Sequence, residues 1–209
     1  MTPASRQGTW SALVLTGGTG RRLGGVDKAT IDVAGTTLLD HLVGALPPTV
    51  PVVVAGPERP TSRPVTFRAE EPAGAGPVAG IAAALAEIRT PHVAVLAVDI
   101  PWSAPVVTAL VAELCLTDDI DVLIPVDAEG RRQLLCCAWR TAALASSLER
   151  LGDPRGRSVR DLIAGARVQE RVLTPDEASL LADIDTPADL DRELRRGRGP
   201  TLDEGHATD

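Results

Sequence analysis

The sequence predicts an α/β fold in which a parallel or mixed sheet is covered by helices. Short apolar runs alternate with amphipathic stretches along the chain, which is the pattern of such a sheet. At 209 residues the chain is long enough to bury the core of one domain. Because aromatic residues are scarce (three Trp, one Phe and no Tyr), Val, Leu, Ile and Ala have to form this core. No repeat or second boundary interrupts the pattern, and we expect one domain over residues 1–196.

Six segments are expected to be strands and six to be helices. The apolar runs that predict strands cover residues 11–16, 51–55, 92–98, 120–125, 132–139 and 168–173. The amphipathic stretches that predict helices cover residues 37–46, 77–89, 104–115, 141–151, 158–164 and 187–196. Thr37, with Asp40 three residues later, and Thr186, with Pro187 after it, provide capping signals at two helix starts. Apolar periodicity is lost after the last helix, so residues 197–209 are expected to be a disordered tail.

Composition argues against several classes of protein. A net charge of −7 and few aromatic rings do not suit a nucleic-acid binder, which usually has a basic patch and stacking aromatics. The cysteines, Cys115, Cys136 and Cys137, are odd in number and lack Cys-x-x-Cys spacing, which disfavours a disulfide framework and a zinc site. We expect Cys136 and Cys137 to be buried structural thiols. Neither a signal peptide nor a membrane-spanning apolar run is evident, so a cytoplasmic protein with no membrane partner is expected.

The loop after the first predicted strand is the most informative segment. It reads Leu15-Thr16-Gly17-Gly18-Thr19-Gly20-Arg21-Arg22-Leu23-Gly24-Gly25-Val26-Asp27-Lys28. Glycines let a backbone approach an anion closely, and two arginines and a lysine add positive charge. A strand followed by such a loop indicates a phosphate cradle and hence a nucleotide. The spacing fits neither a Walker loop nor a dinucleotide fingerprint. The alternative is a Gly-rich surface loop with scattered charge.

A second candidate site lies at the end of an apolar run. Residues 93–98 read as a central strand buried on both faces, and Asp99 follows directly. Sheets of this class bind ligands at the carboxyl ends of their strands. A carboxylate buried there needs a hydrogen-bonded partner or a metal, and one or two carboxylates plus substrate phosphates commonly hold Mg²⁺. Alternatively, Asp99 only caps the helix that begins near Ala104, although Ser103 is better placed for that.

Together these motifs resemble those of the molybdenum cofactor guanylyltransferases, which are nucleotidyltransferases of the glycosyltransferase-A type. The first loop is similar to the family's opening motif and differs at Thr16, Gly20 and Leu23. The segments 99–101 and 76–80 resemble its Asp-x-Pro and Gly-Pro-Leu-Ala-Gly motifs. The resemblance runs from about residue 11 to residue 196. It implies a three-layer α/β/α Rossmann-like nucleotidyltransferase fold with a mostly parallel central sheet.

The resemblance also implies a function: transfer of GMP from GTP to molybdopterin, with pyrophosphate released and Mg²⁺ as cofactor. It implies that the catalytic residues are Lys28, Arg22 and Asp99, and that the metal ligands are Asp99 and Asp185. The expected nucleotide-binding residues are Leu15, Thr16, Gly17, Gly18, Arg21, Lys28, Glu71, Gly76, Gly80 and Asp99. Either Glu71 or Glu70 would contact the guanine edge, unless both are simply solvated. Gln133 and residues 155–160 fall where the family binds its pterin substrate.

Some alternatives stay open at this stage. The family has two asparagines where this chain has Asp183 and Asp185, and an aspartate could bind the metal more tightly or repel the substrate phosphates. Gly17 stands where cytidylyl relatives have alanine, which favours a purine. A cytidylyl or sugar-phosphate nucleotidyltransferase, or a nucleotide-binding paralogue without activity, would use the same loop. We expect a monomer whose macromolecular contacts are transient ones with cofactor-handling proteins.

Overall fold

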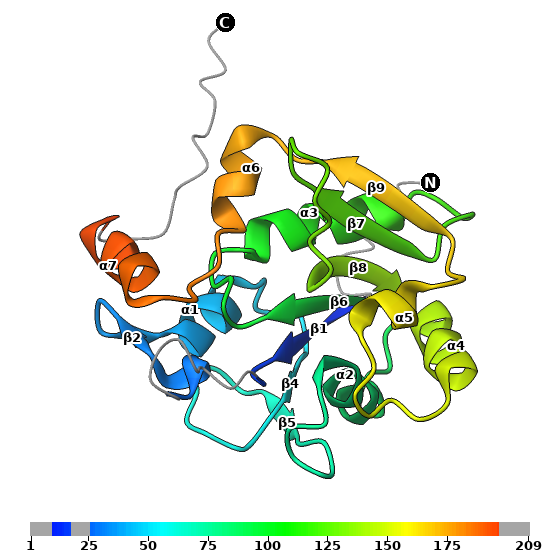
Figure 1. Cartoon of the computed structure of the whole chain (residues 1–209), viewed down its shortest axis with the longest axis horizontal. Helices are drawn as coiled ribbons and strands as arrows, with labels where there is room; N and C mark the ends of the chain where they lie inside the picture. The colour runs from blue at the N-terminus through cyan, green and yellow to red at the C-terminus, as the bar shows by residue number, and fades with distance from the viewer. Residues whose placement is uncertain (1–9, 18–25, 197–209) are drawn as a thin grey trace, which may run out of the picture.

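A seven-stranded sheet, with the strand order β5-β4-β1-β6-β8-β7-β9, runs through the centre of the molecule (Figure 1). The computed structural model describes residues 10–17 and 26–196, so the tail predicted at 197–209 lies outside it. β8 is antiparallel to β6 and β7, and the other neighbouring pairs are parallel, which confirms a mostly parallel sheet. The strands are β1 (Trp10–Leu15), β4 (Val52–Ala55), β5 (Thr66–Arg68), β6 (His92–Ala97), β7 (Val122–Val126), β8 (Cys136–Arg140) and β9 (Val168–Val172).

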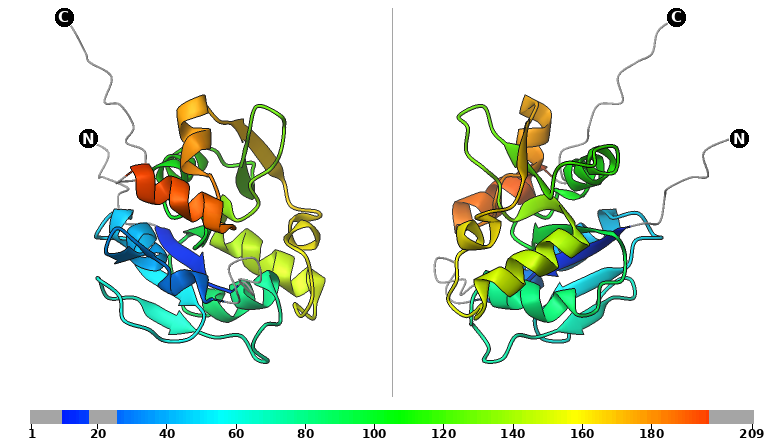
Figure 2. Two further views of the ribbon diagram at one scale, coloured as in Figure 1. Left: turned by 60° about the vertical axis from the view of Figure 1, so that its left-hand side comes forward. Right: turned by 90° about the vertical axis from the view of Figure 1, so that its right-hand side faces the viewer.

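Helices cover both faces of the sheet and complete the predicted three layers (Figure 2). One core lies under α1 (Leu38–Ala45), α3 (Ala104–Leu114) and α6 (Pro175–Leu180). The other lies under α2 (Pro77–Leu85), α4 (Thr141–Leu151) and α5 (Val159–Ile163). Successive side chains of a strand point to opposite faces, so in β1 Ala12 and Val14 join the first core while Leu13 and Leu15 join the second. This alternation explains why residues 12–15 of the strand are all apolar.

A short hairpin and a last helix lie beside the first core. The hairpin consists of β2 (Asp32–Val33) and β3 (Thr36–Thr37), and it follows the 3-10 turn η2 (Lys28–Thr30). Helix α7 (Pro187–Arg196) contacts β2. Trp102 Nε1 donates to Glu193 Oε2 of α7 at 3.0 Å, and the Glu193 residue is only 3% exposed. Helix α7 is therefore anchored to the body of the fold, and with it the segment that precedes it.

Two of the predicted capping bonds are confirmed, whereas the one expected from Ser103 is not made, although α3 begins at Ala104 as predicted. Thr37 Oγ1 accepts from Asp40 N at 3.1 Å, and Thr186 Oγ1 accepts from Asp189 N at 3.2 Å. Ser103, in contrast, makes no capping bond to α3. Its backbone is helical (φ −72°, ψ −10°), whereas an N-cap hydroxyl reaches the first amides from an extended conformation. Its Oγ is buried and has no hydrogen-bond partner within the described residues.

The strand prediction for residues 132–139 is wrong at its beginning. β8 starts at Cys136, because a turn comes first: Gln133 N donates to Pro125 O at 2.9 Å and Cys136 N donates to Gln133 O at 3.2 Å. The hairpin, β5 and α6 were not predicted from the sequence. Each of these elements is short, and β5 and the hairpin strands carry few buried side chains from which periodicity could be recognised.

Cys136 and Cys137 are buried in β8, as predicted. Burial raises the pKa of the Cys137 thiol to about 12 and also raises the pKa of the Cys136 thiol, because a thiolate would lose its hydration there. Both thiols therefore stay protonated at neutral pH and serve as small apolar side chains, not as nucleophiles.

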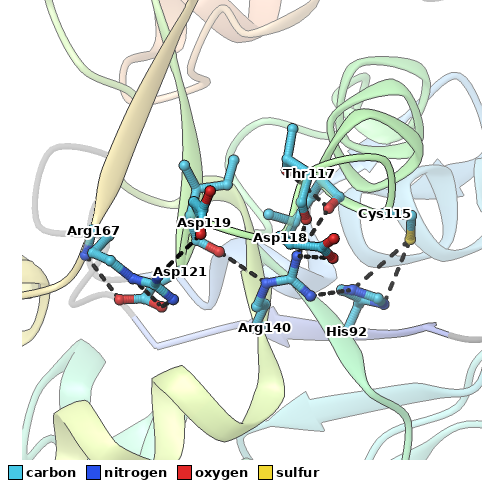
Figure 3. A network of polar contacts seen from close by, with 10 residues as sticks. His92, Cys115, Thr117, Asp118, Asp119, Asp121, Arg140 and Arg167 are labelled. Atoms are coloured by element: carbon cyan, nitrogen blue, oxygen red, sulfur yellow. Dashed lines mark hydrogen bonds and ion pairs between the residues drawn. The ribbon is translucent and has the colours of Figure 1, made fainter.

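Polar contacts hold the end of the sheet at which β6 begins (Figure 3). Arg140 Nε donates to Ile120 O at 2.9 Å, and Arg140 Nη2 donates to Thr117 O. Arg167 Nη2 lies 2.7 Å from Asp121 Oδ1, and this hydrogen bond lowers the pKa of Asp121. These contacts join the starts of β7 and β9 to the end of β8. They lie away from Asp99, which follows the opposite end of β6.

Candidate active site

Three side chains that are distant in sequence meet near the carboxyl ends of β1 and β6. Lys28 Nζ lies 3.0 Å from Asp99 Oδ2, and it also contacts Asp185 Oδ1. The ammonium group is thus held between two carboxylates. The sequence analysis predicts all three residues for the site, and the structure brings them together.

Backbone hydrogen bonds place the two carboxylates. Val98 N donates to Leu15 O at 2.9 Å, which extends the pairing of β6 with β1 as far as Asp99. Ile184 N donates to Asp99 O at 2.8 Å, which brings the segment before α7 alongside. Thr186 and Asp189 form a reciprocal cap at the start of α7: Asp189 Oδ2 accepts from Thr186 N at 2.9 Å, and Thr186 Oγ1 accepts from Asp189 N at 3.2 Å. The cap of α7 and the hydrogen bond from Ile184 N to Asp99 O therefore hold Asp185 next to Asp99.

Lys28 keeps its positive charge in this setting. Its side chain is only 11% exposed. Burial on its own lowers the pKa of Lys28, but the hydrogen bonds and charges of Asp185 and Asp99 outweigh it and raise the pKa above its usual value. Lys28 is also the only lysine of the chain, and every other basic side chain apart from histidine is an arginine.

The two carboxylates fit the coordination of Mg²⁺. Oxygen atoms of Asp99 and Asp185 contact one ammonium group, so they are close enough to share a single cation. Within residues 10–17 and 26–196, no three His, Cys, Asp or Glu side chains group as a complete metal cage. Mg²⁺ commonly needs only one or two carboxylates when substrate phosphates and water complete its coordination.

A cavity of about 490 Å³ opens next to the turn that carries Lys28: Asp27 lines it, whereas Lys28, Asp99 and Asp185 do not. The loops that follow β1, β4 and β5 form its walls, and the start of α2 closes it. Thr16, Gly17 and Asp27 line it from the first loop, and Gly56 and Arg59 line it from the second. This size and this position at the carboxyl edge of a parallel sheet suit a small-molecule ligand.

Thr16 and Gly17 lie at the mouth of the first loop. Thr16 is buried, and its Oγ1 donates to Ala55 O at 2.9 Å, so this hydroxyl ties β1 to β4. A Cβ atom built on Gly17 would meet no atom within 4 Å among the described residues beyond its chain neighbours. The φ angle of Gly17 lies outside the left-handed region. The backbone conformation of Gly17 therefore does not itself require a glycine.

Glu70, and not Glu71, lines the cavity. Glu70 Oε1 accepts from Gly74 N at 3.1 Å, and Oε2 lies 3.8 Å from the Cβ position of Gly80, while Glu71 is exposed. Of the two glutamates, Glu70 is therefore the one placed to contact a ligand in this cavity. Gly80 packs α2 against Leu15 of β1, and Gly76 begins α2 with a φ of 102°.

The remaining predicted site residues divide into two groups. Leu15 lines the cavity, whereas Gly18, Arg21 and Arg22 lie outside the described residues. The sequence analysis did not single out two lining residues, Gly56 and Arg59. A Gly-Pro pair after an apolar run, at Gly56-Pro57, marks a strand end, which is the signal that could have drawn attention to this second loop.

Gly56→Ala is expected to lower the free energy of unfolding by roughly 1–3 kcal/mol, because it overpacks the cavity floor. A Cβ on Gly56 would lie 2.0 Å from Thr16 Oγ1, which is itself held by Ala55 O. Urea denaturation followed by circular dichroism measures the change. Gly44→Ala is the matched control: Gly44 lies in α1 with open space around it, so alanine there should stabilise by about 1 kcal/mol. If Gly56→Ala is as stable as wild type, the Thr16 side chain can move away from the added methyl group with no loss of stability.

Comparison with known proteins places the chain in a family. The MobA-like NTP transferase domain matches residues 12–172. A molybdenum cofactor guanylyltransferase of Cupriavidus necator is 30% identical over 86% of this chain and 94% of its own length, and one of Acidiphilium cryptum is 32% identical over 86% and 91%. The molybdopterin-guanine dinucleotide biosynthesis protein A of Archaeoglobus fulgidus has a similar fold, with a TM-score of 0.69 at 24% identity over 89% of this chain and 97% of that one. The chain belongs to the MobA-like NTP transferase family.

Proposed function

We propose that this protein transfers GMP from GTP to the terminal phosphate of molybdopterin and releases pyrophosphate. The observation that carries the proposal is the convergence of Lys28, Asp99 and Asp185 at the carboxyl edge of the sheet, where Asp27, the neighbour of Lys28, lines the cavity. The names of the relatives supply the substrates, because they are guanylyltransferases of the molybdenum cofactor. A nucleotide-binding paralogue without activity would not need a lysine and two carboxylates brought together from three parts of the chain.

In the proposed reaction an oxygen of the molybdopterin phosphate attacks the α-phosphorus of GTP. A new P–O bond forms as the bond from the α-phosphorus to the bridging oxygen breaks, and pyrophosphate carries away the electron pair. The attacking phosphate is already an anion, so no general base is required. Lys28 and the backbone amides of its loop would hold the triphosphate, and catalysis would rest on positioning and on neutralised charge.

Asp99 and Asp185 would hold Mg²⁺ in this reaction. Bound there, the ion would neutralise charge on the phosphate oxygens and fix their orientation. The carboxylate of Asp185 adds one negative charge where an amide would add none. It therefore favours the cation, which supports a metal-ligand role for this residue over simple repulsion of the phosphates.

GTP and molybdopterin are the only partners that the proposal requires. No helix in the described part of the chain is both long and apolar enough to cross a membrane. A monomer in the cytoplasm, with transient contacts to cofactor-handling proteins and none to nucleic acid, is the setting we propose.

The decisive test is to incubate the protein with molybdopterin, Mg²⁺ and each labelled nucleoside triphosphate in turn, and to identify the product by mass spectrometry. The guanine dinucleotide is expected from GTP. A product formed only from CTP would replace the proposal by a cytidylyltransferase. Stabilisation of the fold by GTP with no pyrophosphate release would point to a non-catalytic nucleotide binder.

Base selectivity is expected to depend on Gly17 and Glu70. The open space beside Gly17 leaves room for a purine, and a methyl group there should hinder GTP more than CTP. A carboxylate of Glu70 can accept from both N1–H and N2–H of guanine, and Glu70→Gln would weaken both bonds at a cost of roughly 1–3 kcal/mol. Gly17→Ala and Glu70→Gln should each lower the ratio of kcat/KM for GTP to that for CTP by about 5-fold or more.

The exposed neighbour Glu71 provides the control for this measurement. Glu71→Gln removes the same charge one residue away and should leave the GTP-to-CTP ratio unchanged. If Glu71→Gln lowers the ratio while Glu70→Gln does not, the base contact belongs to Glu71 after all. If Gly17→Ala slows both nucleotides equally, the space beside Gly17 does not select the base.

A further inference from the structure

We infer that Arg59 is a positioning residue: it holds Asp27, and Asp27 fixes the turn that presents Lys28 to the site. The inference rests on the proposed function, because that function gives Lys28 its task. No motif of the sequence analysis includes Arg59, which comes from the loop after β4 and reaches across the cavity wall to the first loop.

The contact between Arg59 and Asp27 is a closely held ion pair. Arg59 Nη1 lies 2.5 Å from Asp27 Oδ2, and Arg59 Nε donates to Pro57 O at 3.2 Å. Only 10% of the Arg59 side chain is exposed, although the residue lies in a surface loop. The Asp27 side chain is 43% exposed. A loop arginine usually remains in solvent, so the low exposure of Arg59 together with its ion pair to Asp27 indicates a structural purpose.

Asp27 uses its other carboxylate oxygen to cap the turn η2. Oδ1 accepts from Ala29 N at 3.1 Å, and the backbone carbonyl of Asp27 accepts from Thr30 N at 3.0 Å. A single 3-10 turn of three residues has little stability of its own, because few hydrogen bonds repay the ordering of its backbone. The ion pair with Arg59 orients the carboxylate that makes the cap.

Lys28 is the first residue of this turn, so its direction depends on the cap. Its Nζ reaches Asp99 at 3.0 Å, and a rotation of η2 by a fraction of a turn would move it out of contact. Arg59 therefore holds Asp27, Asp27 caps η2, and Lys28 extends from η2 to the carboxylates of Asp99 and Asp185. Arg59 also lines the cavity, so the competing explanation is that it binds the nucleotide directly.

A double-mutant cycle separates these two explanations. Arg59→Met removes the guanidinium, and Asp27→Asn removes the charge of its partner but keeps a side-chain oxygen able to cap. Each is expected to lower kcat/KM for GTP by roughly 10-fold, and the double variant by little more than either one alone, because both break the same contact. Losses that multiply would mean that Arg59 acts independently of Asp27, and they would overturn the inference.

A second measurement uses the single lysine of the chain and needs no turnover. Amine-specific acetylation followed by peptide mass spectrometry reports on Lys28 alone among the side chains. In the free protein, Arg59→Met and Asp27→Asn should each raise the labelling rate of Lys28 by several-fold, because its ion pairs loosen. An unchanged rate in both variants would overturn the inference, even if turnover falls.

The control is another ion pair of similar length. Arg68 Nη2, in β5, lies 2.8 Å from Glu87 Oε1, in the turn after α2, and neither residue lines the cavity. Arg68→Met should change neither kcat/KM nor Lys28 labelling. Because labelling is read without substrate, it remains informative if GTP turns out not to be the substrate, whereas a wild-type protein without guanylyl transfer contradicts only the proposed function.

Discussion

Asp99→Asn is expected to reduce kcat/KM for GTP by roughly 100- to 1,000-fold, the largest effect of any single substitution in this site. The amide has nearly the same shape as the carboxylate, so packing at the end of β6 is preserved. What is lost is the negative charge that would hold a divalent cation, and with it the ion pair to Lys28, whose Nζ lies 3.0 Å from Asp99 Oδ2. Steady-state rates of pyrophosphate release over a range of Mg²⁺ concentrations measure both consequences.

The dependence on Mg²⁺ distinguishes a metal ligand from a residue that only orients Lys28. Loss of a ligand should shift the half-saturating Mg²⁺ concentration upward, whereas loss of orientation should lower the rate at every concentration alike. Asp176→Asn, in the exposed first turn of α6, removes the same charge elsewhere on the surface and should leave both values unchanged. If Asp99→Asn keeps the wild-type dependence on Mg²⁺, Asp99 is not a ligand.

The parts of this fold that the sequence predicts well are those whose pattern is local. In β1 and β6 every residue is buried, and all but Ser11 and His92 are apolar, so the apolar run predicts each strand almost to its ends. β8 differs, because the first four residues of its predicted range, 132–135, do not alternate between polar and apolar. They form a turn through Gln133 instead of a strand. That turn depends on Pro125 of the neighbouring strand, a contact that no local pattern contains.

The difference between local patterns and contacts of distant segments also explains which site residues could be identified from the sequence. Lys28, Asp99 and Asp185 each stand at an element boundary, and strand order then brings them together. The choice between Glu70 and Glu71 could not be made, because both lie in an irregular loop after β5 and no periodic pattern fixes which one faces the cavity. Arg59 was missed because its partner, Asp27, lies in another loop, and only the parallel pairing of β1 with β4 brings these loops together.

Lys28→Met is expected to lower kcat/KM for GTP by about 10- to 100-fold, since a charge-assisted hydrogen bond of this kind contributes roughly 1.5–3 kcal/mol. Methionine keeps the length of the side chain and removes the ammonium. Lys28→Arg keeps the charge and should still lose much of the activity, because a planar guanidinium cannot take the position of a compact ammonium between Asp99 and Asp185. Full activity of Lys28→Arg would show that only the charge matters.

Removing the ammonium should also change how the free protein responds to pH and to Mg²⁺. The pKa of Lys28 is raised on folding, so its contribution to stability is complete below its unfolded value of 10.5 and is lost as the pH rises through the folded value. The difference in unfolding free energy between wild type and Lys28→Met should therefore be constant through neutral pH and shrink only above about pH 10.5. In Lys28→Met the two carboxylates face each other without a cation between them, so Mg²⁺ should raise the melting temperature of this variant more than that of wild type. Equal shifts in the two proteins would mean that Asp99 and Asp185 do not share a cation, and the metal site would have to lie elsewhere.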